Sequence, residues 1–97
     1  MKNIPNVSDN SLITEAGNYN SSFDVIYNRL LQTWLSPFVA RSEVHTFSGG
    51  LISSKTLANA DSENNGPQEK FYFGKRKVFY SKESLAKWIA EHCSYKN

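Results

Sequence analysis

The chain has 97 residues, of which 39% are hydrophobic, and its formal net charge is +2. This length suits one domain with a modest core and leaves no room for a large substrate-enclosing enzyme. No apolar run reaches the roughly 18–20 residues of a membrane span, and one cysteine, Cys93, cannot form an internal disulfide, so we expect a soluble cytoplasmic protein.

The charges are distributed unevenly along the chain. Residues 1–65 contain four Lys or Arg residues and six acids, whereas residues 66–97 contain seven Lys or Arg residues and three acids. A basic C-terminal third within one small domain points to a polyanionic partner on one face.

The composition divides the chain into an arm, a domain and a tail. Residues 1–21 are rich in Asn and Ser and show no sustained hydrophobic period, so we interpret them as a flexible polar arm. Periodic hydrophobic segments fill residues 22–93, where we place the single domain, and residues 94–97 form a short tail.

Two helices are predicted in the first half of this domain. The first covers Phe23–Leu35, because its apolar residues recur at the spacing of an amphipathic helix; they are Phe23, Ile26, Tyr27, Leu30, Leu31 and Trp34. A second helix is expected from Ser36-Pro37, with Ala40, Val44 and Phe47 on one face. The glycines at positions 49 and 50 end it.

A short polar helix is expected after the glycine turn. Ser53 is a suitable N-cap, Leu57 and Ala60 can face the core, and Gly66-Pro67 follows the end of the helical pattern. A helix, a glycine turn and a second short helix together form the outline of a helix-turn-helix, whose second helix offers one face to a DNA groove.

The last part of the domain predicts a β-hairpin and a final helix. Two aromatic triplets flank the basic turn of residues 74–77, which favours a hairpin, or wing, over residues 71–80. Ser81 then caps a helix over Lys82–His92. The predicted fold class is therefore mainly α with a small β-hairpin, arranged as a winged helix-turn-helix.

The candidate DNA contacts lie on the wing and on the polar helix. Three consecutive cations at the hairpin tip suit phosphates or a minor groove; they are Lys75, Arg76 and Lys77. On the helix, Ser54, Lys55 and Asn59 lie away from the apolar face and can contact bases or phosphates. Asp61 and Glu63 would repel a phosphate strand unless they point away from it.

Enzymatic chemistry lacks its usual residues in this sequence. His45 and His92 are the two histidines, and neither lies in a metal-ligand spacing. The acids are scattered, and the glycine pair does not open a phosphate-binding loop with a lysine. We expect a protein that is not an enzyme and needs no cofactor or metal.

One combination of short motifs resembles a known family. The motifs follow one another in the order Thr56-Leu57-Ala58-Asn59, Gly66-Pro67, Gly74–Lys77 with Tyr80, and Leu85–Ile89. In this order and spacing they resemble the small excisionase-like, or AlpA-like, helix-turn-helix proteins of phages and integrative elements. The resemblance covers somewhat under half of the chain.

The resemblance implies a winged-helix fold related to the MerR DNA-binding domain. It also implies binding to double-stranded DNA through Ser54, Lys55 and Asn59 on the helix and through Lys75, Arg76 and Lys77 on the wing. Such proteins bend attachment-site DNA and recruit an integrase or recombinase, or they regulate transcription of the element. Because one small monomer should bind DNA with modest affinity, we expect several copies on tandem sites. The alternative is a protein-interaction module that uses the Phe23–Leu35 helix.

Overall fold

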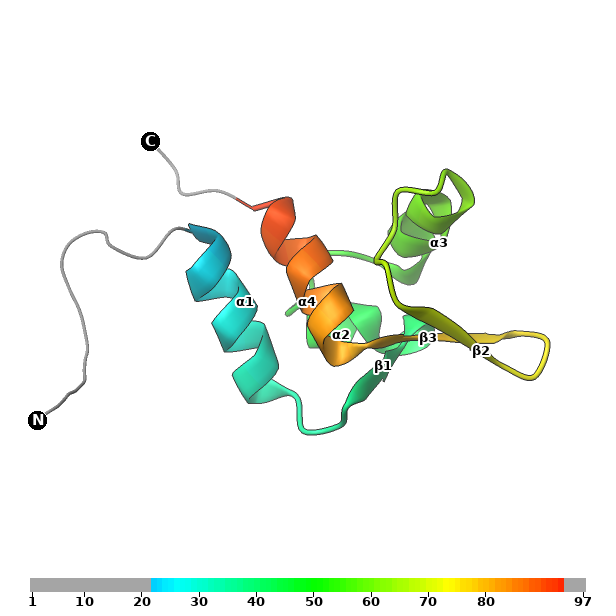
Figure 1. The fold of residues 1–97 in the computed structure, drawn as a ribbon, viewed down its shortest axis with the longest axis horizontal. Coiled ribbons are helices and arrows are strands. Elements are labelled where there is room, and N and C mark those ends of the chain that lie inside the picture. The colour runs from blue at the N-terminus through cyan, green and yellow to red at the C-terminus, as the bar shows by residue number, and fades with distance from the viewer. Residues whose placement is uncertain (1–21, 94–97) are drawn as a thin grey trace, which may run out of the picture.

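The computed structural model describes residues 22–93, and the arm and tail expected from the sequence lie outside them (Figure 1). The elements are α1 (Ser22–Thr33), β1 (Phe38–Ala40), a 3-10 turn η1 (Arg41–Glu43), α2 (Val44–Phe47), α3 (Ser54–Ser62), β2 (Lys70–Phe73), β3 (Lys77–Ser81) and α4 (Lys82–Glu91). These residues therefore form a small α/β unit with four α-helices and a three-stranded antiparallel sheet.

Helices α1 and α4 pack side by side, while the β2–β3 hairpin extends away from them (Figure 1). The predicted stripe of α1 faces the core, where Ile26, Leu30 and Leu31 are partly buried against it. Leu85 and Ile89 of α4 are buried in that core. The amphipathic periods that predicted both helices thus describe one shared packing surface.

Helix α1 ends at Thr33, two residues before the predicted end at Leu35. The ammonium group of Lys82, the first residue of α4, donates hydrogen bonds to the carbonyl oxygens of Leu31 at 3.2 Å and Trp34 at 2.7 Å. A cation at a helix C-terminus also complements the negative end of the helix dipole. The end of α1 is therefore fixed by a tertiary contact with α4.

The helix expected from Ser36-Pro37 is wrong over residues 38–40, which form the strand β1. Phe38 lies opposite Ser81 and Ala40 opposite Phe79, so β1 completes a sheet of order β1-β3-β2. Helical backbone begins only at Arg41, and Val44 and Phe47 are buried as predicted. The fold has a three-stranded sheet rather than an isolated hairpin because β3 has a partner on both sides.

The two faces of the sheet differ in burial. Val78 and Tyr80 of β3 point into the core with Val39 of β1, whereas Phe71 and Phe79 lie on the opposite face.

The hairpin and the final helix were predicted correctly, and the Ser81 side chain accepts a hydrogen bond from the Ser84 N–H at 3.1 Å. Within residues 22–93, no helix combines the length and hydrophobicity needed to cross a membrane.

Candidate nucleic-acid interface

Helix α3 begins where the sequence predicted. The Ser53 side chain accepts a hydrogen bond from the Thr56 N–H at 3.1 Å and caps the helix. The turn before it contains Gly49 and Gly50 with φ of +69° and +89°, a backbone conformation that favours glycine. Leu57 is fully buried and anchors the inner face of α3 to the core. The polar helix is therefore held in one position by a cap, a turn and a buried leucine.

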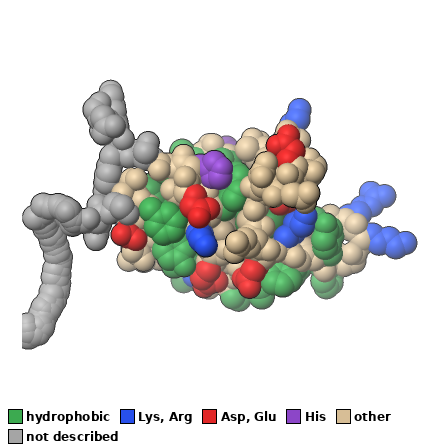
Figure 2. All heavy atoms as spheres, turned by 45° about the horizontal axis from the view of Figure 1, so that its top comes forward, with side chains coloured by type: hydrophobic (Ala, Val, Ile, Leu, Met, Phe, Trp, Pro, Cys, Tyr) green, Lys and Arg blue, Asp and Glu red, His purple; other side chains and the backbone are tan. Residues whose placement is uncertain are grey.

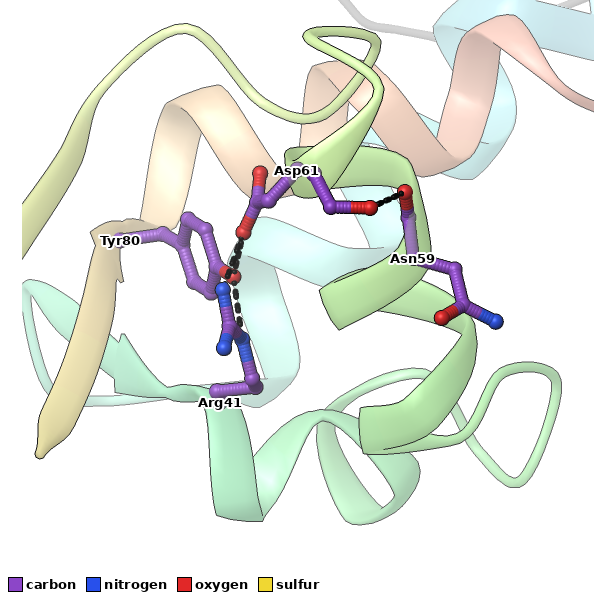
Figure 3. Close-up of polar contacts among 5 residues, drawn as sticks. Arg41, Asn59, Asp61 and Tyr80 are labelled. Carbon is purple, nitrogen blue, oxygen red and sulfur yellow. Dashed lines mark hydrogen bonds and ion pairs between the residues drawn. The ribbon is translucent and has the colours of Figure 1, made fainter.

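A polar cluster joins α3 to the hairpin and to η1 (Figure 3). The Asp61 carboxylate of α3 accepts hydrogen bonds at 2.5 Å from the Tyr80 hydroxyl and at 2.5 Å from Nη2 of Arg41. Nε of Arg41 donates a further hydrogen bond to the Tyr80 hydroxyl oxygen at 2.9 Å. Because the Asp61 side chain is only 6% exposed, this carboxylate is paired inside the domain. We name these three residues the Arg41–Asp61–Tyr80 cluster.

The cluster also needs a glycine beside it. A Cβ atom on Gly66 would lie 1.9 Å from Oδ1 of Asp61, a distance that no side chain tolerates. The Gly66-Pro67 pair that the sequence analysis noted therefore has a packing role here. The glycine lets the loop after α3 pass directly over the buried carboxylate.

The cluster shifts the pKa values of two of its members. Burial of the Tyr80 hydroxyl and its hydrogen bond to Asp61 raise the pKa of Tyr80 well above the usual tyrosine value. Burial lowers the pKa of Arg41, but its hydrogen bonds to Tyr80 and Asp61 outweigh that effect, and the net shift is upward. Arg41 is therefore a cation and Tyr80 a neutral donor at neutral pH.

The outer face of α3 carries the side chains predicted for contact. Ser54, Lys55 and Asn59 are exposed, and the Asn59 side chain points away from the Arg41–Asp61–Tyr80 cluster in Figure 3. Asp61 is turned inward, so it is removed from this face, while Glu63 is exposed at the far end of the helix. The exposed first two turns of α3 therefore present a cation, a hydroxyl and an amide.

The hairpin tip presents its cations to solvent. Gly74 opens the turn with φ of +68°, and Lys75, Arg76 and Lys77 are all exposed. None of these three forms an ion pair with another side chain in the part of the chain that the structure describes. Figure 2 shows Lys and Arg side chains projecting from this end of the molecule, on the right.

An open hollow of about 350 Å³ lies between η1, the start of α3 and the turn end of the hairpin. It brings together Ser54 from the start of α3 and Arg76 and Lys77 from the hairpin. Its remaining lining residues are Arg41, Ser42 and Val78. Lys55, Asn59 and Lys75 do not line the hollow. The predicted residues are thus divided between this hollow and the exposed surfaces on either side of it.

Sequence reasoning missed Arg41, which both lines the hollow and holds Asp61. A signal for it existed in the sequence, because Asp61 lies four residues after Leu57 and so shares the buried face of the helix. An acid on that face needs a cation or donor from elsewhere in the fold. Which cation supplies it depends on the long-range pairing of β1 with β3.

Within residues 22–93, no group of three or more His, Cys, Asp or Glu side chains is arranged to hold a metal ion. Comparisons of the chain with protein-family models, curated proteins and solved structures gave no match.

Proposed function

We propose that this chain binds double-stranded DNA, with α3 in the major groove and the β2–β3 hairpin along the adjacent backbone or minor groove. The observation that carries the proposal is the hollow between them, which is lined by the exposed cations Arg76 and Lys77, by Arg41, which is paired with Asp61, and by the first residue of α3. Cations spaced along a groove between a helix and a hairpin suit a phosphate strand, while the exposed helix face reaches base edges.

The electrostatics of α3 support the same proposal. Asp61, the one acid within α3, forms an ion pair with Arg41 and accepts a hydrogen bond from Tyr80. The cations at the hairpin tip are exposed and lack ion-pair partners among the described side chains. A phosphate strand approaching this side therefore meets positive charge and avoids the nearest carboxylate.

Within this proposal the fold is a winged helix-turn-helix of the excisionase-like, MerR-related type. The order of η1 with α2, the glycine turn, α3, the hairpin and α4 is compatible with that arrangement. The role is that of a recombination directionality factor or a small transcriptional regulator of a mobile element, without enzymatic activity. An integrase or recombinase is the expected protein partner in the first case.

The other candidate, an interaction module built on the Phe23–Leu35 helix, has less support. The apolar stripe of α1 already packs against α4 and the core. Its exposed side carries few large apolar groups in the region described, apart from Leu35 just beyond the helix end.

Fluorescence anisotropy of a labelled duplex tests the proposal. The wild type is compared with Arg76→Ala/Lys77→Ala, which removes two cations from the hollow, and with Arg29→Ala/Lys87→Ala, which removes two exposed cations from α1 and α4. We expect salt-sensitive binding that the first variant weakens at least tenfold and the second changes little. A folded wild type that does not bind duplex at low salt would contradict the proposal, as would equal losses in both variants.

A further inference from the structure

Strand β2 forms an edge of the sheet, and its outward side is uncovered. The sheet order β1-β3-β2 leaves β2 with one paired neighbour, and Tyr72 and Phe73 are 62% and 73% exposed. Proteins usually protect such an edge with proline, bulges or several charges. β2 has no proline and a single charge, Lys70, so its unpaired backbone groups are open to another strand.

The outer face of the sheet next to this edge carries an aromatic cluster. Phe71 stacks on Phe79 with ring centroids 5.2 Å apart, and Phe38 of β1 packs edge-on against both rings. Phe71 and Phe38 remain 39% and 45% exposed. A strand added beside β2 would extend this aromatic row and cover part of it.

The charges along the strand favour a second copy of this chain as that strand. Glu69 stands just before β2, where its carbonyl oxygen accepts a hydrogen bond from the Ser81 N–H at 3.4 Å. Lys77 lies at the other end, opposite Phe73. If two copies of β2 lie antiparallel, Glu69 of one copy stands opposite Phe73 of the other. Within that second copy Phe73 pairs with Lys77, so Glu69 and Lys77 lie in one cross-strand row with Phe73 between them. Parallel placement would set like charges together instead.

We propose that two copies pair through antiparallel β2 strands centred on Phe71, which forms one continuous six-stranded sheet. In this register Phe71 meets Phe71 of the second copy, and Lys70 lies opposite Tyr72. The ammonium of Lys70 is already 5.7 Å from the Tyr72 ring centroid within one strand, so the same contact becomes available across the pair. The proposal does not depend on DNA binding.

Analytical ultracentrifugation of the full chain without DNA tests the pairing. We expect a monomer–dimer equilibrium that Glu69→Lys weakens roughly tenfold at low salt, because each new lysine stands about 10 Å, two strand spacings, from Lys77 of the other copy and the pair contains two such rows. Adding Lys77→Glu to that variant should restore dimerisation to within about threefold of the wild type by reversing the charges. Both positions are exposed, and far-UV circular dichroism checks that the variants fold.

Oxidative cross-linking tests the register. In a Cys93→Ser background, Phe71→Cys should form a disulfide-linked dimer, since residues facing each other across antiparallel strands lie about 5 Å apart. Phe73→Cys is the control, because its symmetry mate is four positions away along the strand. A monomeric wild type up to about 1 mM would overturn the proposal. A dimer that Glu69→Lys leaves unchanged, or one that cross-links as well at position 73, would also overturn it.

Discussion

Asp61 on α3 accepts a hydrogen bond from the hydroxyl of Tyr80 on β3, which ties the exposed helix to the hairpin that follows it in the chain. Arg41 binds the same carboxylate oxygen, so three elements meet at one buried acceptor. The angle between α3 and the hairpin, and hence the shape of the hollow, depends on this contact. A change at any of the three residues should therefore affect both stability and ligand binding.

Replacing Arg41 should destabilise the fold. In Arg41→Met the methylene packing is kept, but the nearly buried Asp61 carboxylate loses its cation, which we expect to lower the free energy of unfolding by about 2–3 kcal/mol. Urea denaturation followed by circular dichroism measures the change. In a double-mutant cycle with Asp61→Asn, the two losses should not add, because the second substitution removes the unpaired charge. Additive losses would show that the two side chains act separately.

Replacing Gly66 should disturb the same cluster from the other side. The Cβ of Gly66→Ala would overlap the Asp61 carboxylate, so the loop or the acid must move, at a cost of about 1–3 kcal/mol. Gly74→Ala is a useful comparison because it has open space around Cβ and only the strain of positive φ. Thermal unfolding should separate the two effects. Adding Asp61→Ala should relieve the stability loss caused by Gly66→Ala, because the overlapping carboxylate is then gone, and should not relieve the loss caused by Gly74→Ala.

Alkaline pH should weaken the fold through Tyr80. Its raised pKa means that the folded state holds the phenolic proton more tightly than the unfolded chain does. The stabilisation is therefore fully present below the unfolded value of 10.0 and is lost progressively as the pH rises above it. A difference titration between wild type and Tyr80→Phe, read from phenolate absorbance, isolates this group. Ionisation of Tyr80 near pH 10 in the folded protein would contradict the expectation.

Removing the ammonium of Lys82 should loosen α1. Lys82→Met deletes the hydrogen bonds to the carbonyl oxygens of Leu31 in the last turn of α1 and of Trp34 just after it, with an expected loss of about 1–2 kcal/mol. Hydrogen exchange should quicken along α1 more than along α3. Lys87→Met, on an exposed position of the same helix α4, is the control and should leave exchange unchanged. Equal effects of both substitutions would indicate a general charge effect.

Under the proposed function, the three cations at the hairpin tip should determine how steeply DNA affinity falls with salt. Each phosphate contact contributes about 0.9 to the slope of log K against log salt concentration. Lys75→Ala/Arg76→Ala/Lys77→Ala should therefore lower that slope by up to about 3. Titrations at several salt concentrations give the slope directly. An unchanged slope would place the phosphate contacts elsewhere on the molecule.

The parts of the fold that the sequence predicted are those with local signals. Ser53 and Ser81 cap α3 and α4, and the glycines at 49, 50 and 74 occupy left-handed turns, so each element could be located from its neighbours. Strand β1 has no such signal, because three residues after Ser36-Pro37 look like the start of a helix. Its identity is fixed by pairing with β3, some forty residues later.

The residues of the candidate site also fall into those with a local sequence signal and those placed by a long-range contact. The exposed cations and the outer residues of α3 were found because composition and helical spacing show which positions face solvent. The link between Arg41 and Asp61 was not found, since it joins residues twenty positions apart through a buried contact. That contact pairs the Asp61 carboxylate inside the domain, on the side of α3 away from the residues proposed to meet DNA.

The groups that hold α3 in place lie on its inner side or outside its two ends: Leu57 and Asp61 face inward, Ser53 precedes the helix and Gly66 follows it. Ser54, Lys55 and Asn59 take no part in that support through their side chains. An evolving lineage, or a library of variants, can therefore exchange these outer residues for others with little cost in stability. In such a scaffold, the specificity of recognition is free to diverge while the architecture is inherited intact.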